Sequence, residues 1–228
     1  MTGLRIHPRV PGALPELLAR FRTLPVANVS DTMGRLAGAD AGLRPWHNGG
    51  VLCGPAFTVR TRPGDNLMVH KALDMAEPGD VLVVDGGGET ANALVGELML
   101  AHAMRRGLAG VVIHGAVRDL DWIRRTGMPV YACGVTHRGP YKNGPGQINV
   151  AISVSGMVVR PGDVVLGDSA GVVCIPLAQA ETVCAAAEAK AAAEERQMSA
   201  ILAGTVDRSW IDTELARQNC DYPDGPEG

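Results

Sequence analysis

The sequence predicts an α/β protein in which buried strands alternate with amphipathic helices. An unbroken apolar run at 81–84 is followed by a glycine loop, a helical pattern and a second apolar run at 111–113, which is the order of a βαβ crossover. Strand-like segments then cluster within 149–175, and an alanine-rich helix is expected over 177–203. So many strands beside one crossover favour mixed sheets over a purely doubly wound fold.

The composition restricts the classes of function. The 228 residues are 46% hydrophobic, which is enough for one compact domain with a sizeable core. The formal net charge of -3 and the 4% content of aromatic residues predict no binding to nucleic acid or to an anionic membrane surface. No apolar run has the length of a membrane span. An anionic ligand would therefore have to be bound by a local site.

The cysteines and the N-terminus predict a cytoplasmic protein. The five cysteines are odd in number and form no CxxC pair, which favours reduced thiols over disulfides or a zinc site. Residues 1–12 contain an early proline and lack the apolar stretch of a signal peptide. We therefore expect the chain to work in the cytoplasm.

Two helices are predicted near the N-terminus. Residues 13–23 carry four apolar side chains at helical spacing. Ser30 and Asp31 are residue types that cap helix N-termini, so a second short helix is expected to begin there and to end near Gly34 or Gly38. Both helices would precede the strand expected over 51–62.

One strand and three tight turns surround the crossover. Residues 51–62 alternate bulky apolar and polar side chains, as in a strand with one buried face. The tripeptide Pro-Gly-Asp occurs at 63–65, 78–80 and 161–163, where proline and glycine favour a turn. The last two lead straight into apolar runs, whereas Asp65 is expected to cap a helix.

The crossover is expected to continue from its first strand through Gly86–Gly88 as a flexible turn. Its helix is predicted from three apolar residues at helical spacing, with Gly107 as the C-cap. The three are Leu94, Leu98 and Ala101. The start of this helix stays open, because Gly96 marks a possible first turn.

The remaining elements are expected in a simple order. They are a helix over 120–127, a strand over 129–133, a strand pair over 149–159, a hairpin over 164–175, a long helix over 177–203 and a polar tail over 205–228. Residues 138–147 are rich in glycine and proline and are expected to form a loop. We place the core of a single domain at about 26–176.

The first candidate motif lies in the glycine turn. Gly86–Ala91 matches the pattern G-x-G-x-x-A, which binds dinucleotides when it joins a strand to a helix. That fold also needs an acidic residue at the end of the second strand, where Ile113 and His114 stand here. The motif is therefore weak evidence for a cofactor. Two other roles stay open for these glycines, a tight turn and the wall of a small-ligand pocket.

The second candidate is the pair Arg118 and Asp119, which follows the apolar segment 110–117. Open α/β sheets bind ligands at the carboxyl ends of their strands, and this pair lies at such an end. Glu97 follows Gly96 at the possible start of the crossover helix and is expected at the same edge of the sheet. The alternative is a solvated ion pair on the surface.

Four further polar residues are weaker candidates. Asn66 and His70 lie one helical turn apart and can face a pocket, although a structural histidine is the alternative. Arg138 and Lys142, in the glycine-rich loop, can meet a second carboxylate of a ligand, although exposed loop cations usually contact water.

Several motifs of the chain occur together in one known family. They are G-E-L followed by G-V-V-I-H-G-A-V-R-D, with P-G-D-V-L-V-V-D-G-G-G before them and R-G-P-Y-K-N-G-P-G-Q-I-N-V and P-G-D-V-V-L-G-D after them. Over about 26–204, the chain resembles the RraA-like family, which includes the class II 4-hydroxy-4-methyl-2-oxoglutarate/4-carboxy-4-hydroxy-2-oxoadipate aldolases. The resemblance implies an α/β/β sandwich, a swivelling-domain-like arrangement, with a long C-terminal helix.

The resemblance also implies a lyase that cleaves 4-hydroxy-4-methyl-2-oxoglutarate-type 2-oxo acids to pyruvate by retro-aldol chemistry and decarboxylates oxaloacetate as a side activity. Asp119 would bind Mg²⁺ or Mn²⁺ directly, and Glu97 would hold waters of the metal. Arg118 would bind the keto oxygen and stabilise the enolate. The substrate carboxylate would meet the helix start formed by Gly96, Glu97, Leu98 and Met99.

An assembly is implied as well. By position, Glu194, or Glu195 beside it, would reach the site from the C-terminal helix of a neighbouring subunit in a homotrimer or hexamer, although a solvated helix face is the alternative. Trp122 stands where many relatives have an acid, which bears on substrate preference. Some members of the family are non-catalytic regulators that bind a ribonuclease, and this is the alternative function. Because such regulators can lack the Asp after the Arg, Asp119 favours the enzyme.

Overall fold

The computed structural model describes residues 3–221 of the chain. It divides into two compact units, with the boundary after Glu188. The first unit contains the strands and their covering helices. The second contains the C-terminal part of α6 (Ala180–Leu202) and α7 (Trp210–Arg217). Glu194 therefore belongs to the second unit, and the other candidate residues before it belong to the first.

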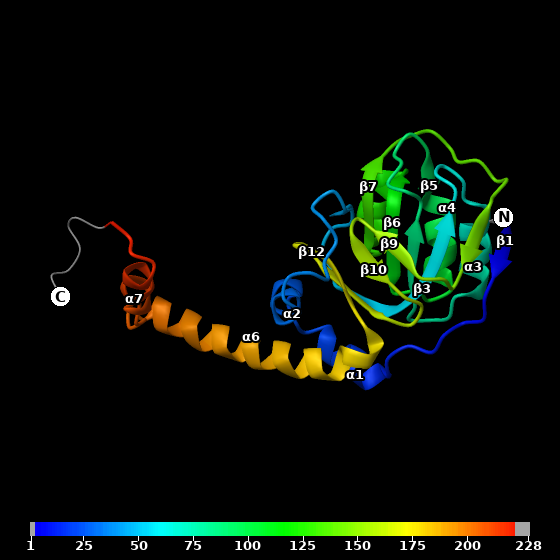
Figure 1. Ribbon diagram of the computed structural model, residues 1–228. Coiled ribbons are helices and arrows are strands. Elements are labelled where there is room, and N and C mark those ends of the chain that lie inside the picture. The colour runs from blue at the N-terminus through cyan, green and yellow to red at the C-terminus, as the bar shows by residue number, and fades with distance from the viewer. Residues whose placement is uncertain (1–2, 222–228) are drawn as a thin grey trace. The chain divides into compact units, whose positions relative to one another are not determined.

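A mixed sheet organises the first unit (Figure 1). Its strand order is β1-β8-β3-β4-β6-β7-β2, and β5 pairs with the end of β6. The neighbours from β3 to β7 are parallel, so their carboxyl ends meet at one edge. These strands are β1 (Leu4–Ile6), β2 (Arg44–Pro45), β3 (Leu52–Thr61), β4 (Val81–Asp85), β5 (Ala93–Val95), β6 (Gly110–Val117), β7 (Val130–Val135) and β8 (Gly146–Ile148).

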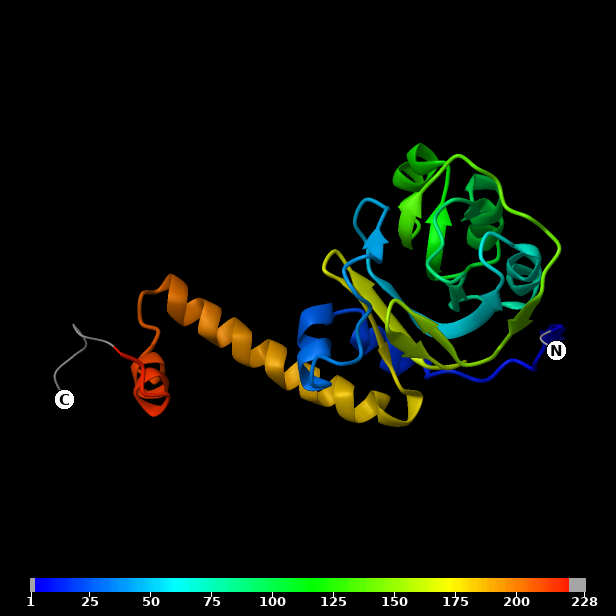
Figure 2. The same ribbon diagram turned by 45° about the horizontal axis from the view of Figure 1, so that its top comes forward.

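The long strand β3 also belongs to a second layer of strands. Its first half pairs antiparallel with β11 (Val164–Asp168), which forms a hairpin with β12 (Gly171–Ile175). A separate two-stranded sheet consists of β9 (Ile152–Val154) and β10 (Met157–Val159). Figure 2 shows the curvature of β3, in cyan, beside these yellow-green strands. Both hairpins confirm the pairs predicted from the sequence.

The sheet is covered on both faces. Helices α3 (Leu67–Met75), α4 (Glu97–Arg105) and α5 (Leu120–Thr126) pack on one face, and the second layer of strands packs on the other. The side chains of β4 and β6 alternate between two buried clusters. Val84, Ile113, Leu100 and Ile123 belong to the first cluster, and Val83, Val112, Ile152 and Val165 belong to the second. This arrangement confirms the predicted α/β fold class.

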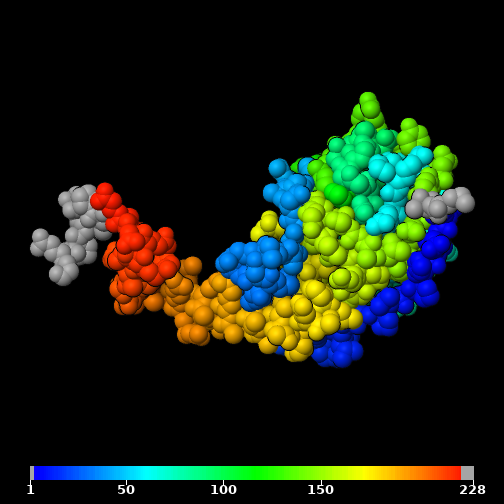
Figure 3. Space-filling view, viewed as in Figure 1, coloured from blue at the N-terminus to red at the C-terminus, as the bar shows by residue number. Residues whose placement is uncertain are grey.

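The N-terminal segment, blue in Figure 3, lies against the surface of the first unit. β1 runs parallel to β8. Nη2 of Arg9 donates a hydrogen bond of 2.6 Å to Oδ1 of the buried Asp80. Helix α1 (Pro15–Phe21) follows within the predicted range 13–23. A charge-assisted bond thus fixes the path of this segment beside the turn that launches β4.

The second helix begins earlier than the sequence predicted. α2 spans Val26–Thr32, so Ser30 and Asp31 lie in its last turn, and the prediction that they cap its start was wrong. The N-cap is Pro25, whose side chain cannot accept a hydrogen bond. Oδ2 of Asp168 accepts the amide of Val26 at 2.9 Å instead. A distant carboxylate therefore replaces the local cap.

The crossover helix also begins differently. Leu94 lies in β5, and α4 starts at Glu97 after Gly96. Leu98 is 79% exposed, so the prediction placed the wrong face of the helix against the core. The buried residues of α4 are Met99, Leu100 and Ala103. Pairing of β5 with β6 overrides the helical pattern of the preceding residues.

The strand predicted over 51–62 is present as β3, but both of its faces are buried apart from Arg60. The predicted alternation fails because β3 is shared by the two layers of strands. α5 lies within the predicted range 120–127. β7 overlaps the strand predicted over 129–133 but ends two residues later, at Val135.

The predicted C-terminal helix is present as η1 (Leu177–Gln179) followed by the 23 residues of α6. The buried side chains of α6 all belong to the first unit and are Ala180, Val183, Cys184 and Ala187. Between 189 and 221, no described side chain is buried. The predicted polar tail contains α7, and its last residues, 222–228, lie outside the described part.

Two further observations concern the chain between residues 3 and 221. None of its helices is both long enough and apolar enough to cross a membrane. All five cysteines are free, as the sequence predicted.

Candidate active site

The site forms where the chain leaves β6. Arg118 donates its amide to the carbonyl of Val95 at 3.0 Å, which holds the end of β6 beside β5. Asp119 then adopts a left-handed conformation, with φ of 62° and ψ of 45°, at the start of α5. Aspartate tolerates this conformation better than most residues because its short polar side chain can form local hydrogen bonds. The turn places both side chains against the start of α4.

Gly96 makes this close approach possible. A Cβ atom at Gly96 would lie 2.5 Å from Oδ2 of Asp119 and 2.8 Å from Nε of Arg118, both shorter than real contacts of this kind. Oδ2 of Asp119 accepts the amide of Glu97 at 2.9 Å and lies 3.5 Å from Nε of Arg118. The structure therefore brings Gly96, Glu97, Arg118 and Asp119 together, as the sequence predicted.

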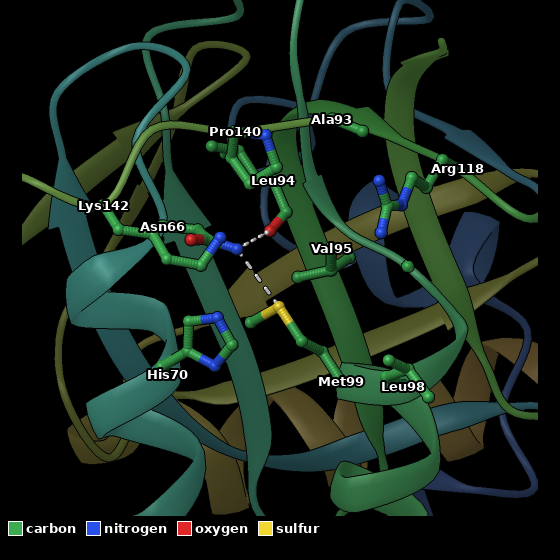
Figure 4. Close-up of a pocket in the computed structure, with 11 residues that line it drawn as sticks. Asn66, His70, Ala93, Leu94, Val95, Leu98, Met99, Arg118, Pro140 and Lys142 are labelled. Atoms are coloured by element: carbon green, nitrogen blue, oxygen red, sulfur yellow. Dashed lines mark hydrogen bonds between the residues drawn. The ribbon is translucent and has the colours of Figure 1, made fainter. Parts of the chain in front are cut away.

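A pocket of about 200 Å³ adjoins these residues (Figure 4). Its lining includes Arg118, Leu98 and Met99 from the predicted site. It also includes three of the weaker candidates, which are Asn66, His70 and Lys142. Arg138 is not among the described lining residues, and its carbonyl accepts the amide of Ala93 at 2.9 Å.

The pocket is basic. No acidic side chain occurs among its described lining residues, whereas Arg118, Lys142 and His70 do. Burial, and then the charge of Lys142, lower the pKa of His70 below its ordinary value. His70 is therefore neutral near pH 7, and the positive charge comes from Arg118 and Lys142. Such a pocket suits an anionic ligand.

Asn66 contributes a buried amide to the wall. Its Nδ2 donates to the carbonyl of Leu94 at 2.8 Å and contacts Sδ of Met99 at 3.2 Å. These contacts fix the orientation of the amide. Its Oδ1 is buried without a hydrogen-bond partner, which is uncommon in folded proteins.

The carboxylates fit a hard, hydrated metal ion. No group of three or more His, Cys, Asp or Glu side chains with the arrangement of a metal site occurs within 3–221. Oδ2 of Asp119 accepts the amide of Glu97, and the side chain of Glu97 is exposed. Mg²⁺ often binds through one or two carboxylates and keeps several waters, so these residues suit Mg²⁺ or Mn²⁺ better than zinc.

Comparison of the sequence with known proteins identifies the family of this chain. A family model described as RraA-like, Aldolase/RraA, matches residues 26–174. The chain belongs to the RraA-like family. A relative from Halalkalibacterium halodurans, which carries the name "Putative 4-hydroxy-4-methyl-2-oxoglutarate aldolase", is 38% identical over 186 residues, 82% of this RraA-like chain and 89% of the relative.

Solved structures of similar proteins share the RraA-like fold. An uncharacterized protein of Pseudomonas syringae has a TM-score of 0.77 and 26% identity, over 86% of this chain and 96% of that one. RraA of Thermus thermophilus, described as an RNA-processing inhibitor, has a TM-score of 0.62 and 32% identity, over 67% of this chain and 92% of that one. The Thermus protein thus matches a smaller part of this chain.

The glycine turn has a structural role. After β4 the chain passes through Gly86–Gly88 to β5 and not to a helix, so this turn lacks the strand-to-helix geometry of the dinucleotide motif. A Cβ at Gly86 would lie 2.5 Å from Leu94 Cδ1, and one at Gly88 would lie 2.9 Å from His114 Nε2. These glycines therefore let the turn pack closely against its neighbours.

Two predicted residues lie elsewhere. Glu194 is on α6 in the second unit, where its Oε1 lies 3.0 Å from Nζ of Lys190. Its role in a neighbouring site stays a prediction. Trp122, which stands where many relatives have an acidic residue, is half-buried and packs against the core cluster beneath the helices. Its side chain therefore stabilises α5.

Asp65 is a residue whose importance the sequence did not reveal. It was expected only to cap α3, and its Oδ1 does accept the amide of Leu67 at 3.0 Å. Its Oδ2 also accepts the amides of Asn143 and Gly144 at 2.7 and 2.9 Å. Among the three Pro-Gly-Asp turns, this one alone is followed by a helix and not by an apolar strand. That difference in the sequence could have distinguished Asp65 from the other two aspartates.

Proposed function

We propose that this RraA-like protein is a divalent-metal-dependent lyase, a class II pyruvate aldolase that cleaves 4-hydroxy-4-methyl-2-oxoglutarate-type 2-oxo acids. Oxaloacetate decarboxylation is its expected side activity. The observation that carries the proposal is the contact of Arg118 and Asp119 with Gly96 at the start of α4, beside a basic pocket. The name of the Halalkalibacterium relative supports the same class of reaction.

The start of α4 and Arg118 would bind the 2-oxo acid. The first amides of a helix lack partners within the helix and favour anions. Asp119 accepts the amide of Glu97, and the carbonyl of Gly96 accepts the amide of Met99 at 3.1 Å. The amide of Leu98, a residue of the pocket lining, therefore remains for the substrate carboxylate. The guanidinium of Arg118 then lies beside the keto oxygen.

The reaction breaks the bond between C3 and C4 of the substrate. The electron pair of this bond forms the enolate of pyruvate, the C4 hydroxyl loses its proton, and C4 becomes the carbonyl of the second product. A proton then adds to C3 and gives pyruvate. Negative charge develops on the keto oxygen, where Arg118 stabilises it most strongly in the transition state. Oxaloacetate gives the same enolate when its C3–C4 bond releases carbon dioxide.

Asp119 would hold Mg²⁺ or Mn²⁺, and Glu97 would orient waters around the ion. When bound, the ion supplies positive charge that withdraws electrons from the keto group. The amide of Glu97 holds Oδ2 of Asp119 in place, which fixes the direction of this carboxylate. Asp119 is thus positioned by the backbone of the helix that also receives the substrate.

The proposal includes an assembly in which Glu194 of a neighbouring subunit completes the site of a homotrimer or hexamer. The second unit supports it, because no described side chain between 189 and 221 is buried although α7 carries large apolar residues. Trp210 is 64% exposed, and Leu202 is 81% exposed. Packing against a neighbouring subunit would remove this apolar surface from water.

The test is release of pyruvate from 4-hydroxy-4-methyl-2-oxoglutarate and from oxaloacetate. The proposal predicts turnover of both with Mg²⁺ and loss of turnover when a chelator is added, with recovery when Mg²⁺ is restored. Background rates in every condition would contradict the lyase.

A second candidate function is binding to a ribonuclease, which the description of the Thermus relative as an RNA-processing inhibitor favours. A pull-down of purified ribonuclease with the intact chain tests it directly. Stable binding without any pyruvate release would favour this function over the lyase.

A further inference from the structure

The three Pro-Gly-Asp turns share one construction. Their glycines, Gly64, Gly79 and Gly162, have φ values of +72°, +89° and +85°, which favour glycine. Each turn ends in a buried aspartate that accepts backbone amides, namely Asp65, Asp80 and Asp163. Asp163 accepts the amides of Arg160 and Leu177, both at 3.0 Å. Such bonds fix the path of a neighbouring segment.

Asp65 differs from the other two in what it holds. It has no exposed surface, and its Oδ2 accepts two amides of a segment 78 or 79 positions away. That segment is 138–144, which we call the pocket strap. Asp80 and Asp163 bond to segments that do not line the pocket.

The pocket strap is fixed along its length. At one end the carbonyls of Arg138 and Gly139 accept hydrogen bonds of 2.9 and 2.6 Å from Ala93 N and Asn92 Nδ2. In the middle, Tyr141 N donates to Gly64 O at 2.8 Å, and Tyr141 O accepts from Asn66 N at 3.0 Å. Asp65 holds the other end.

Between these fixed points, Pro140 and Lys142 line the pocket. Figure 4 shows Lys142 and His70 on the opposite side of the pocket from Arg118. Because His70 is neutral near pH 7, Lys142 supplies the positive charge of that wall. A ligand in the pocket therefore meets one cation at each end.

We propose that Lys142 binds a second carboxylate of the ligand and that Asp65 is a positioning residue, which holds the pocket strap so that Lys142 reaches it. The inference rests on the proposed function and assigns the second carboxylate of its 2-oxo diacid substrates to Lys142. Arg118 holds the keto acid end, and the wall of Lys142 selects the other end.

Equilibrium binding tests this without any turnover. 2-Oxoglutarate has both carboxylates but lacks the C4 hydroxyl that cleavage needs, and 2-oxopentanoate has the same chain length with one carboxylate. Titration calorimetry with Mg²⁺ present compares the two. A partly exposed ion pair is worth up to about 1 kcal/mol, so the wild-type chain should bind 2-oxoglutarate about fivefold more tightly.

Four variants divide the contributions. Lys142→Met should lower the preference to about one, and Lys142→Arg should keep it, because only the charge is needed. In Asp65→Asn one oxygen acceptor becomes an NH2 group, which then faces either the amide of Leu67 or the amides of Asn143 and Gly144. Either orientation disturbs the turn that holds the pocket strap, so the variant should lose most of the preference while 2-oxopentanoate binding changes less than about twofold. Asp163→Asn is the matched control, since it alters a similar buried turn away from the pocket and should keep the preference.

The outcomes separate this inference from the proposed function. Equal binding of the two acids by the wild type, no binding of either acid, or an unchanged preference in Lys142→Met would overturn the role of Lys142. If Asp163→Asn loses the preference to the same extent as Asp65→Asn, Asp65 has only a general structural role and does not position Lys142. If the preference behaves as proposed but no pyruvate is released, the binding site stands and the lyase is wrong.

Discussion

At the scale of single residues, the candidate site depends on the absence of a side chain at Gly96. Its backbone is extended, with φ of -147°, so any residue could adopt it, and the requirement for glycine comes from the 2.5 Å and 2.8 Å approaches of Asp119 and Arg118. A methyl group there must displace both functional side chains. The site is therefore sensitive to the smallest possible substitution.

Gly96→Ala should lower kcat/KM for pyruvate release by about 100-fold or more, because misplacing catalytic groups by an ångström has effects of this size. Gly38→Ala is the control, since a Cβ there would meet its nearest neighbour at 3.6 Å. Steady-state kinetics of both variants measure the difference. Equal, small effects would show that the contact of Gly96 with the two side chains does not matter.

The residues of the site were predictable to different degrees. Arg118 and Asp119 were found from the rule that ligands bind at the carboxyl ends of strands. The partners of Asp65 could not be found, because they are 78 and 79 positions away and no local pattern encodes such pairs. The sequence likewise could not predict that Oδ1 of Asn66 is buried without a hydrogen-bond partner, since this depends on the packing around α3.

At the scale of elements, tertiary contacts decide where helices begin. α2 starts at Val26 because Asp168, from the β11–β12 turn, accepts its first amide. β5 forms where the apolar spacing favoured a helix, because the end of β6 offers it a partner. The βαβ order, both hairpins and α6 were predictable from local patterns, whereas these boundaries were not.

Asp168→Ala should destabilise the fold by about 1 kcal/mol, the usual effect of losing a helix cap. The variant removes the acceptor of Val26 N at 2.9 Å and of Ala170 N at 2.7 Å. Urea unfolding measures the free energy, and Asp168→Asn, which retains an acceptor oxygen, should lose less. A stability equal to that of the wild type would show that α2 does not depend on this carboxylate.

At the scale of the whole molecule, the second unit has no core of its own. No described side chain from 189 to 221 is buried, and its apolar residues face outward. A segment of this kind gains little stability alone, because burial of apolar surface is the main favourable term in folding. Its length and alanine content were predictable from the sequence, whereas its partner was not.

Subunit mixing tests the proposed assembly. Asp119→Ala and Glu194→Gln chains should each be inactive, and unfolding and refolding them together should restore part of the activity. Some sites then receive Asp119 from the Glu194→Gln chain and Glu194 from the Asp119→Ala chain. Each variant refolded alone is the control. No recovery in the mixture, with a mixed oligomer demonstrated by light scattering and mass spectrometry, would contradict a shared site.

The most direct test of metal-dependent cleavage at Asp119 is the rate of pyruvate release from 4-hydroxy-4-methyl-2-oxoglutarate at increasing Mg²⁺, measured for the wild type and Asp119→Asn. Asparagine keeps the shape of the side chain and an acceptor for Glu97 N but removes the charge that a hard cation requires. We expect saturation of the wild-type rate with Mg²⁺ and a loss of at least about 100-fold in the variant at every concentration. Wild-type turnover that does not depend on Mg²⁺, or a variant with the same Mg²⁺ dependence as the wild type, would contradict a metal site at Asp119.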